Sequence, residues 1–132
     1  MFIDASVIVA LLAGAPEATA LAERIAGATA RFTSGPAVLE AAALLSVRLD
    51  IDPVKVEAAV QALLDTAGIA LVPINAAVTK RAVAAFASYG RSPERPKGLS
   101  LAGCLTYACA KAYRVPVLSA GGRFAGTDVE AA

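Results

Sequence analysis

The sequence contains no histidine and only two cysteines. The absence of histidine excludes serine or cysteine nucleophiles that an imidazole activates, and metal sites with imidazole ligands. Cys104 and Cys109 lie five residues apart in a predicted helix, so they point to different faces and suit neither a disulfide nor a zinc pair. Any hydrolysis must therefore rest on carboxylates, on lysine or on a metal held by oxygen ligands.

Long uncharged segments are also missing. Uncharged stretches such as residues 5–16 and 98–110 are shorter than a membrane span. No basic region precedes an apolar core at the N-terminus, and Asp4 stands where a signal peptide would be apolar. We therefore expect a cytoplasmic protein, folded as a single domain over residues 1–132.

Apolar runs alternate with helical patterns along the chain. The runs at residues 1–3, 31–33, 69–74 and 115–119 predict strands. Capping residues and glycine stops predict helices between them, over about 5–12, 16–28, 34–49, 53–66, 76–89 and 100–113. Residues 90–98 contain two prolines and two glycines and are a predicted loop. This order indicates an α/β fold with a mostly parallel sheet covered on both faces.

Three features follow the ends of predicted strands. Asp4 comes directly after the first strand, Glu40 lies near the start of the helix after the second, and Gly121, Gly122 and Arg123 follow the last. Ligands of open parallel sheets bind at this edge, and converging carboxylates without histidine would suit magnesium. Two alternatives are open: Asp4 can be a helix cap, and Glu40 can be a solvated surface residue.

Basic residues gather before the last long helix, although the net charge of the whole chain is only +1. This stretch is either a surface that faces phosphate groups, such as those of RNA, or a solvated charged loop. The residues concerned are Lys80, Arg81, Arg91, Arg95 and Lys97.

Three segments resemble the PIN domains of VapC-type toxins. They read MFIDAS at the start, TSGPAVLEAAALL in the middle and LSLAGCLTYACAKAYRVPVLSAGGRFAGTDV at the end, and their order and spacing agree over the whole chain. The resemblance implies a three-layer α/β/α PIN-like domain with a mostly parallel central sheet. It also implies an RNA-cutting enzyme that uses Mg²⁺ or Mn²⁺, forms a homodimer and is held inactive by a partner antitoxin.

The resemblance also implies a cluster of four acids, of which this chain keeps two. Asp4 matches the first acid and Glu40 the second. Gly103 stands at the third position, in LSLAGC, and Arg123 at the fourth, in AGGRF. Asp128 matches an acid that is sometimes accessory and is a weak candidate ligand. The cofactor is therefore expected to bind weakly or not at all.

The guanidinium of Arg123 suggests an internal replacement for the metal, since it can pair with Asp4 and Glu40 where the cation would sit. Two functions are consistent with this sequence. The first is a VapC-like endoribonuclease with a weakened site, and the second is an inactive PIN domain that dimerises and binds antitoxin or RNA without cleavage. Apolar residues of the helix near residues 52–67 are candidates for a partner surface or for the core: Val54, Val56, Val60 and Leu63.

Overall fold

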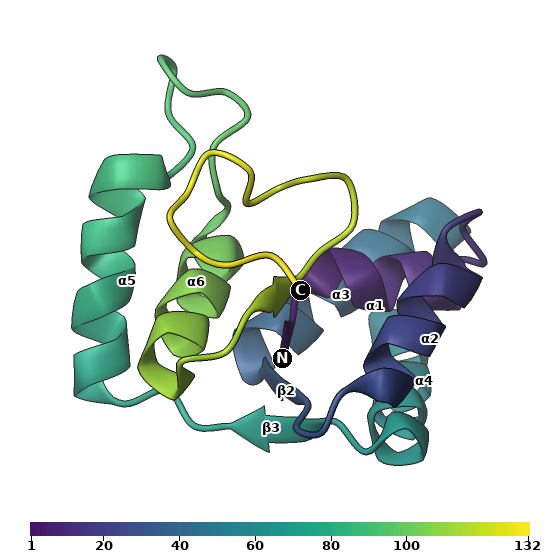
Figure 1. The fold of residues 1–132 in the computed structure, drawn as a ribbon. Coiled ribbons are helices and arrows are strands. Elements are labelled where there is room, and N and C mark those ends of the chain that lie inside the picture. The colour runs from purple at the N-terminus through teal and green to yellow at the C-terminus, as the bar shows by residue number, and fades with distance from the viewer.

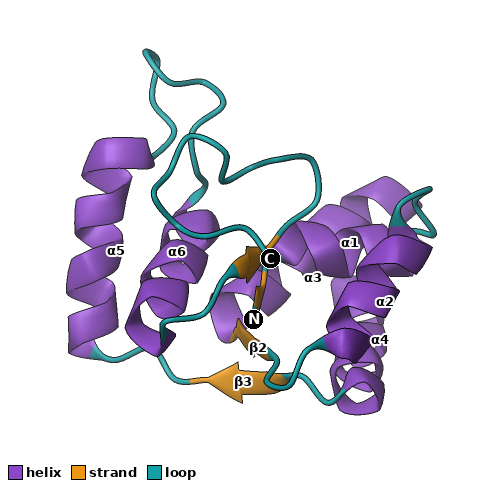
Figure 2. Cartoon of the chain, in the orientation of Figure 1, coloured by secondary structure: helices purple, strands orange, loops and turns teal.

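The computed structural model describes residues 1–132 and shows a central sheet between two layers of helices (Figures 1 and 2). The strands are β1 (Phe2–Ile3), β2 (Phe32–Ser34), β3 (Ala70–Val72) and β4 (Val117–Leu118). The helices are α1 (Ala5–Leu12), α2 (Ala18–Gly27), α3 (Gly35–Leu49), α4 (Pro53–Ala67), α5 (Ala76–Tyr89) and α6 (Leu101–Tyr113). No helix combines the length and the apolar character needed to cross a bilayer.

The four strands are all parallel and lie in the order β3-β2-β1-β4. Phe2 of β1 is in register with Phe32 on one side and with Val117 on the other. Parallel neighbours need helical crossovers, which this alternation of strands and helices supplies. The predicted parallel sheet is confirmed, and because all strands run the same way, their carboxyl ends meet at one edge.

Neighbouring residues of a strand supply two separate cores, because side chains alternate between the faces of a sheet. Ile3 and Leu118 are fully buried in the core built with α1 to α4. Phe2 and Val117 are buried in the core built with α5 and α6. Figure 1 shows these two helical layers on opposite sides of the strands. The predicted three-layer arrangement is therefore confirmed.

The helix starts follow the capping residues that the sequence displays. The side chains of Ser34, Asp52, Asn75 and Ser100 each accept a hydrogen bond from a backbone N–H of the helix they precede. Gly68 ends α4 in the left-handed conformation, with φ of 62°. The strands differ from the predicted runs at their ends: β3 keeps three residues and β4 two.

The apolar residues of α4 divide between the core and the surface. Val56 and Val60 are buried, Leu63 packs against the same core, and Val54 is exposed. Exposed apolar side chains on the neighbouring helix α3 include Leu39 and Val47. Val56, Val60 and Leu63 therefore belong to the core. The exposed apolar side chains include Val54 on α4 and Leu39 and Val47 on α3.

Candidate active site

Asp4 lies at the carboxyl end of β1 and is fully buried. Its Oδ2 atom accepts hydrogen bonds from the backbone N–H of Ser6 at 3.0 Å and from the Ser6 hydroxyl at 2.6 Å. Asp4 is therefore the N-cap of α1, whose positive dipole end favours the carboxylate. The Ser6 hydroxyl also accepts from the N–H of Ala120 at 3.0 Å, which ties Asp4 to the segment after β4.

Glu40 reaches the same edge from α3. This helix begins directly after β2, and the neighbouring Ala37 and Ala41 face the core. The Glu40 side chain is only 18% exposed. A carboxylate so covered needs partners, because burying an unpaired charge costs several kcal/mol. The solvated alternative for Glu40 is therefore wrong.

Arg123 supplies the partner of both carboxylates. Its Nη1 atom lies 3.3 Å from Asp4 Oδ2, and its Nη2 atom lies 3.5 Å from Glu40 Oε1. Gly121 and Gly122, with φ of 70° and 65°, form the left-handed turn that brings Arg123 back over the sheet edge. The ion pairing expected from the sequence is confirmed.

The guanidinium satisfies only half of the carboxylate oxygens. Asp4 Oδ1 and Glu40 Oε2 are buried and have no hydrogen-bond partner. Two carboxylates with one guanidinium leave a single net negative charge at the site. The site is thus closed by an internal cation but keeps two free acceptor atoms.

Gly103 lies beside this cluster, in the first turn of α6. Its N–H donates to the Ser100 hydroxyl at 3.0 Å, and the same oxygen accepts from Arg123 Nη2 at 3.1 Å. A Cβ atom at Gly103 would lie 3.3 Å from that oxygen. Asp4, Glu40 and Arg123 therefore meet at one place, and a side chain at position 103 would stand next to the Ser100 hydroxyl that also holds the guanidinium.

Asp128 does not join them. It accepts hydrogen bonds from the hydroxyl of Tyr107 at 2.6 Å and from Lys111 at 3.1 Å, next to α6. Burial and the hydrogen bond to Asp128 raise the pKa of Tyr107 to about 12. The hydrogen bonds from Tyr107 and Lys111 lower the pKa of Asp128. Its ligand role stays a prediction that this arrangement does not support, because the carboxylate already has partners elsewhere.

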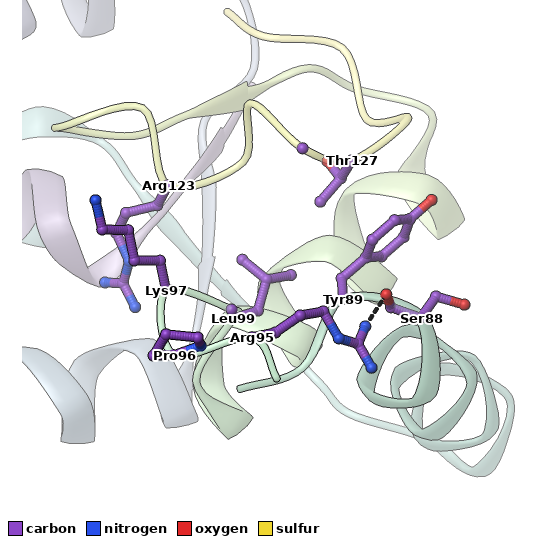
Figure 3. A pocket seen from close by; sticks show the side chains of 10 residues that line it. Ser88, Tyr89, Arg95, Pro96, Lys97, Leu99, Arg123 and Thr127 are labelled. Carbon is purple, nitrogen blue, oxygen red and sulfur yellow. Dashed lines mark hydrogen bonds between the residues drawn. The ribbon is translucent and has the colours of Figure 1, made fainter. Parts of the chain in front are cut away.

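The five basic candidates divide into two groups. Arg95 and Lys97 line the same pocket as Arg123 (Figure 3). Lys80 and Arg81 are exposed in α5 and Arg91 is exposed in the loop, and none of the three lines that pocket. Their role as RNA contacts remains a prediction for all five.

Ser6 and Ser100 have a part that the sequence alone did not reveal. The Ser6 hydroxyl holds Asp4, and the Ser100 hydroxyl holds Arg123 in addition to capping α6. The only signal in the sequence is their position beside the matched motifs, as DAS and LSLAG. A hydroxyl that caps a helix and one that also binds a neighbouring side chain look identical in a sequence.

The fold and the order of these residues match a known family. Residues 1–130 match the PIN domain family. The chain belongs to the PIN domain family. It is 34% identical over 132 residues to Ribonuclease VapC28 of Mycobacterium tuberculosis, covering 100% of this chain and 97% of that protein. It is also 34% identical over 131 residues to Ribonuclease VapC of Mycolicibacterium smegmatis, covering 99% and 98% of the two chains.

Two solved structures show the same fold. VapC20 of Mycobacterium tuberculosis, described as a sarcin-ricin loop cleaving toxin, superimposes with a TM-score of 0.74 at 18% identity, over 97% of this chain and 95% of that one. A chain of a toxin–antitoxin complex from Klebsiella pneumoniae gives a TM-score of 0.69 at 20% identity, over 96% and 92%. The PIN architecture therefore extends over essentially the whole chain.

With Arg123 in place, the residues present fit the divalent cation that the family resemblance implies only poorly. No group of three or more acidic, cysteine or histidine side chains is placed to hold a metal ion. A divalent ion between Asp4 and Glu40 would bring three positive charges, with Arg123, against two negative ones. Mg²⁺ also needs oxygen ligands in a near-octahedral arrangement. Here the Arg123 guanidinium lies against both carboxylates that would supply such ligands.

Proposed function

We propose that this chain is a VapC-like PIN-domain toxin, an endoribonuclease whose hydrolysis is slowed because Arg123 occupies its site. The observation that carries the proposal is the meeting of Asp4 and Glu40 at the carboxyl edge of a PIN-type sheet. The full-length similarity to ribonucleases of the VapC type supports the reaction class. The ion pairs of Arg123 support the slow rate.

Mg²⁺ or Mn²⁺ is the proposed cofactor, bound weakly or not at all. In metal-dependent hydrolysis the cation activates water and neutralises the developing charge. Carboxylates about 4 Å apart repel each other by about 4 kcal/mol at an effective dielectric constant of 20, so an acid-rich site without metal is strained. Arg123 relieves that strain here, which favours the metal-free state at the expense of the reaction.

The second candidate function is binding without cleavage. It is favoured by the same observation, since a site that is closed by an internal cation keeps the fold while it loses the chemistry. In this case the chain still dimerises and still binds an antitoxin or RNA.

The proposed partners are a cognate antitoxin, RNA and a second copy of the chain, all in the cytoplasm. The relative from Klebsiella pneumoniae is part of a toxin–antitoxin complex, which supports the first of these. Leu39, Val47 and Val54 on α3 and α4 are 72%, 84% and 74% exposed. Such a set of exposed apolar side chains supports a protein partner on this side of the molecule.

Cleavage of a mixed RNA substrate with Mn²⁺ tests the proposed function. We expect slow cleavage by the unchanged chain, well below that of VapC28 under the same conditions, and none by Asp4→Asn. The matched control is Asp65→Asn, which removes an exposed carboxylate of α4 that bonds only to Gln61. This control should cleave like the unchanged chain.

Two results would overturn parts of this proposal. Cleavage as fast as that of VapC28 would show that Arg123 does not weaken the site. If the unchanged chain and Asp4→Asn show the same background cleavage, and circular dichroism shows that both are folded, the enzymatic function is rejected. The second candidate function, binding without cleavage, would then stand.

A further inference from the structure

The segment after β4 carries both Arg123 and Asp128, but the proposed function uses only the first of them. Figure 1 shows this segment in yellow, looping out from the end of β4 and back toward it. Two backbone hydrogen bonds of 3.0 Å close its residues 122–125 and 124–127 into successive turns. We call residues 122–128 the C-terminal turn. Its own hydrogen bonds make it a compact unit that carries Arg123 near one end and Asp128 at the other.

The contacts of Arg123 hold it only loosely. The hydrogen bonds of its guanidinium, to Asp4, Glu40 and Ser100, are single contacts of 3.1 to 3.5 Å. The two glycines before it have left-handed backbone angles, which glycine leaves easily, and no other group packs within 4 Å of the place a Cβ atom would take. The position of Arg123 over the carboxylates therefore depends on what fixes the rest of the turn.

Asp128 fixes the far end of the C-terminal turn. Its Oδ1 atom accepts from the Tyr107 hydroxyl at 2.6 Å, and its Oδ2 atom accepts from Lys111 at 3.1 Å. Tyr107 is only 9% exposed, and its hydroxyl has no other partner. A covered donor bonded to a carboxylate makes one of the stronger hydrogen bonds, whereas the exposed pair with Lys111 contributes little. The bond to Tyr107 is therefore the main attachment of Asp128.

One face of α6 holds both ends of the turn. Ser100, the cap of α6, binds Arg123, while Tyr107 and Lys111 bind Asp128. The three helix positions are seven and four residues apart, which corresponds to about two turns and one turn of an α-helix, so they lie along one face. The C-terminal turn thus lies along α6, with Arg123 at the end that faces the site.

We propose that Asp128 is a positioning residue, which holds the C-terminal turn on α6 so that Arg123 stays on Asp4 and Glu40. The buried ring of Phe124 attaches the middle of the turn to the core. A segment attached at one side chain can pivot about it, whereas the second attachment at Asp128 fixes its orientation. The inference rests on the proposed function only in taking the two carboxylates as the reacting groups.

Trypsin cleavage after Arg123, in EDTA and without RNA, measures how often the turn opens. Arg123 must leave its carboxylates, and Phe124 must leave the core, before the bond between them can be cut. The rate follows the population of the open turn if opening and closing are faster than cleavage. Tyr107→Phe removes only the hydroxyl that binds Asp128, so it should raise this rate about tenfold. Mass spectrometry of the fragments assigns the bond that is cut.

Three further variants serve as controls. Tyr113→Phe removes the hydroxyl of an exposed tyrosine on the same helix that does not bind the turn, and it should leave the rate unchanged. Asp128→Asn keeps an acceptor for Tyr107 but loses the charge, so we expect a rise of only about threefold. Lys111→Met breaks the exposed pair and should raise the rate less than about twofold.

Two readouts separate positioning from a general loss of stability. Cleavage after Arg48, within helix α3, requires wider unfolding and should not rise in Tyr107→Phe. In the NMR spectrum of ¹⁵N-labelled Tyr107→Phe, the side-chain Nε–H signal of Arg123 should shift toward that of Arg24, which is exposed and makes no ion pair. The same signal should not move in Tyr113→Phe.

The proposal is overturned if Tyr107→Phe changes neither the cleavage after Arg123 nor its NMR signal, or if Tyr113→Phe changes them equally. It is also overturned if cleavage after Arg48 rises as much as cleavage after Arg123. These measurements contain neither metal nor RNA. An effect of Tyr107→Phe on Arg123 without any RNA cleavage would reject only the enzymatic function. RNA cleavage by the unchanged chain without such an effect would reject only the role of Asp128.

Discussion

Replacing Gly103 and Arg123 together by aspartate should give a protein that Mn²⁺ stabilises and that cleaves RNA at least about 100-fold faster than the unchanged chain. The change places carboxylates at the two positions that meet Asp4 and Glu40 and removes the internal cation. At a Mn²⁺ concentration of 100 times Kd, binding contributes about 2.7 kcal/mol, which raises the melting temperature by roughly 10 °C. The unchanged chain should show no such rise.

The helix tolerates the new side chain at position 103. Gly103 is the third residue of α6 after the Ser100 cap, where an acid interacts favourably with the helix dipole. The Cβ atom would lie 3.3 Å from the Ser100 hydroxyl and 3.4 Å from Leu99 Cβ, so its neighbours must move by a few tenths of an ångström. The first turn of α6 should therefore remain intact.

Thermal melts with and without Mn²⁺, together with RNA cleavage rates, measure this prediction. Gly27→Asp with Arg91→Asp makes the same charge change at two exposed positions away from the site and should respond like the unchanged chain. Gly103→Asp alone should also bind no Mn²⁺, since the new carboxylate would pair with Arg123. If the Gly103→Asp, Arg123→Asp protein is folded but Mn²⁺ changes neither its melting temperature nor its cleavage rate, positions 103 and 123 are not the sites of the two missing acids.

The second large effect is the loss of stability that we expect from Arg123→Met. Removing one partner of a buried ion pair costs about 3–5 kcal/mol, because a charge is left uncompensated. Asp4 keeps its two bonds from Ser6, and Arg123 is 24% exposed, so we expect a smaller decrease in the free energy of unfolding, of about 2 kcal/mol. The protein without metal should therefore unfold at lower urea concentration.

Urea denaturation without metal measures this decrease, with the slope of the transition as a check that the unfolded states are comparable. Adding Asp4→Asn and Glu40→Gln to Arg123→Met should restore much of the stability, since no carboxylate is then left without its partner. Lys111→Met, which breaks the exposed pair with Asp128, should change stability far less. An Arg123→Met midpoint no lower than that of Lys111→Met would show that Arg123 does not support the metal-free site.

The meeting of Asp4, Glu40 and Arg123 could be predicted from the sequence because it follows from local rules. Capping residues and glycine stops separate the helices, and the apolar runs between them have the short length of parallel strands. Once the sheet is parallel, residues after its strands must gather at one edge. The pairing itself follows from the resemblance, which puts Arg123 where an acid of the family's cluster would stand.

Other parts of the site depend on turns that carry no periodic pattern. Asp128 follows a turn at residues 121–127, and its direction toward Tyr107 depends on backbone angles that the sequence does not specify. The pocket lined by Arg95, Lys97 and Arg123 likewise depends on Arg95 folding back onto the end of α5, through bonds to backbone carbonyls that no sequence pattern reveals. Charge alone grouped Arg95 and Lys97 with Lys80, Arg81 and Arg91, whereas only the first two reach the pocket.

Diffraction from crystals soaked in Mn²⁺ tests the central claim, that Arg123 stands in place of the metal. Anomalous scattering locates manganese independently of any activity. We predict no anomalous peak between Asp4 and Glu40, with the Arg123 guanidinium still within about 3.5 Å of both carboxylates. A strong peak coordinated by Asp4 and Glu40, with Arg123 turned away, would contradict it.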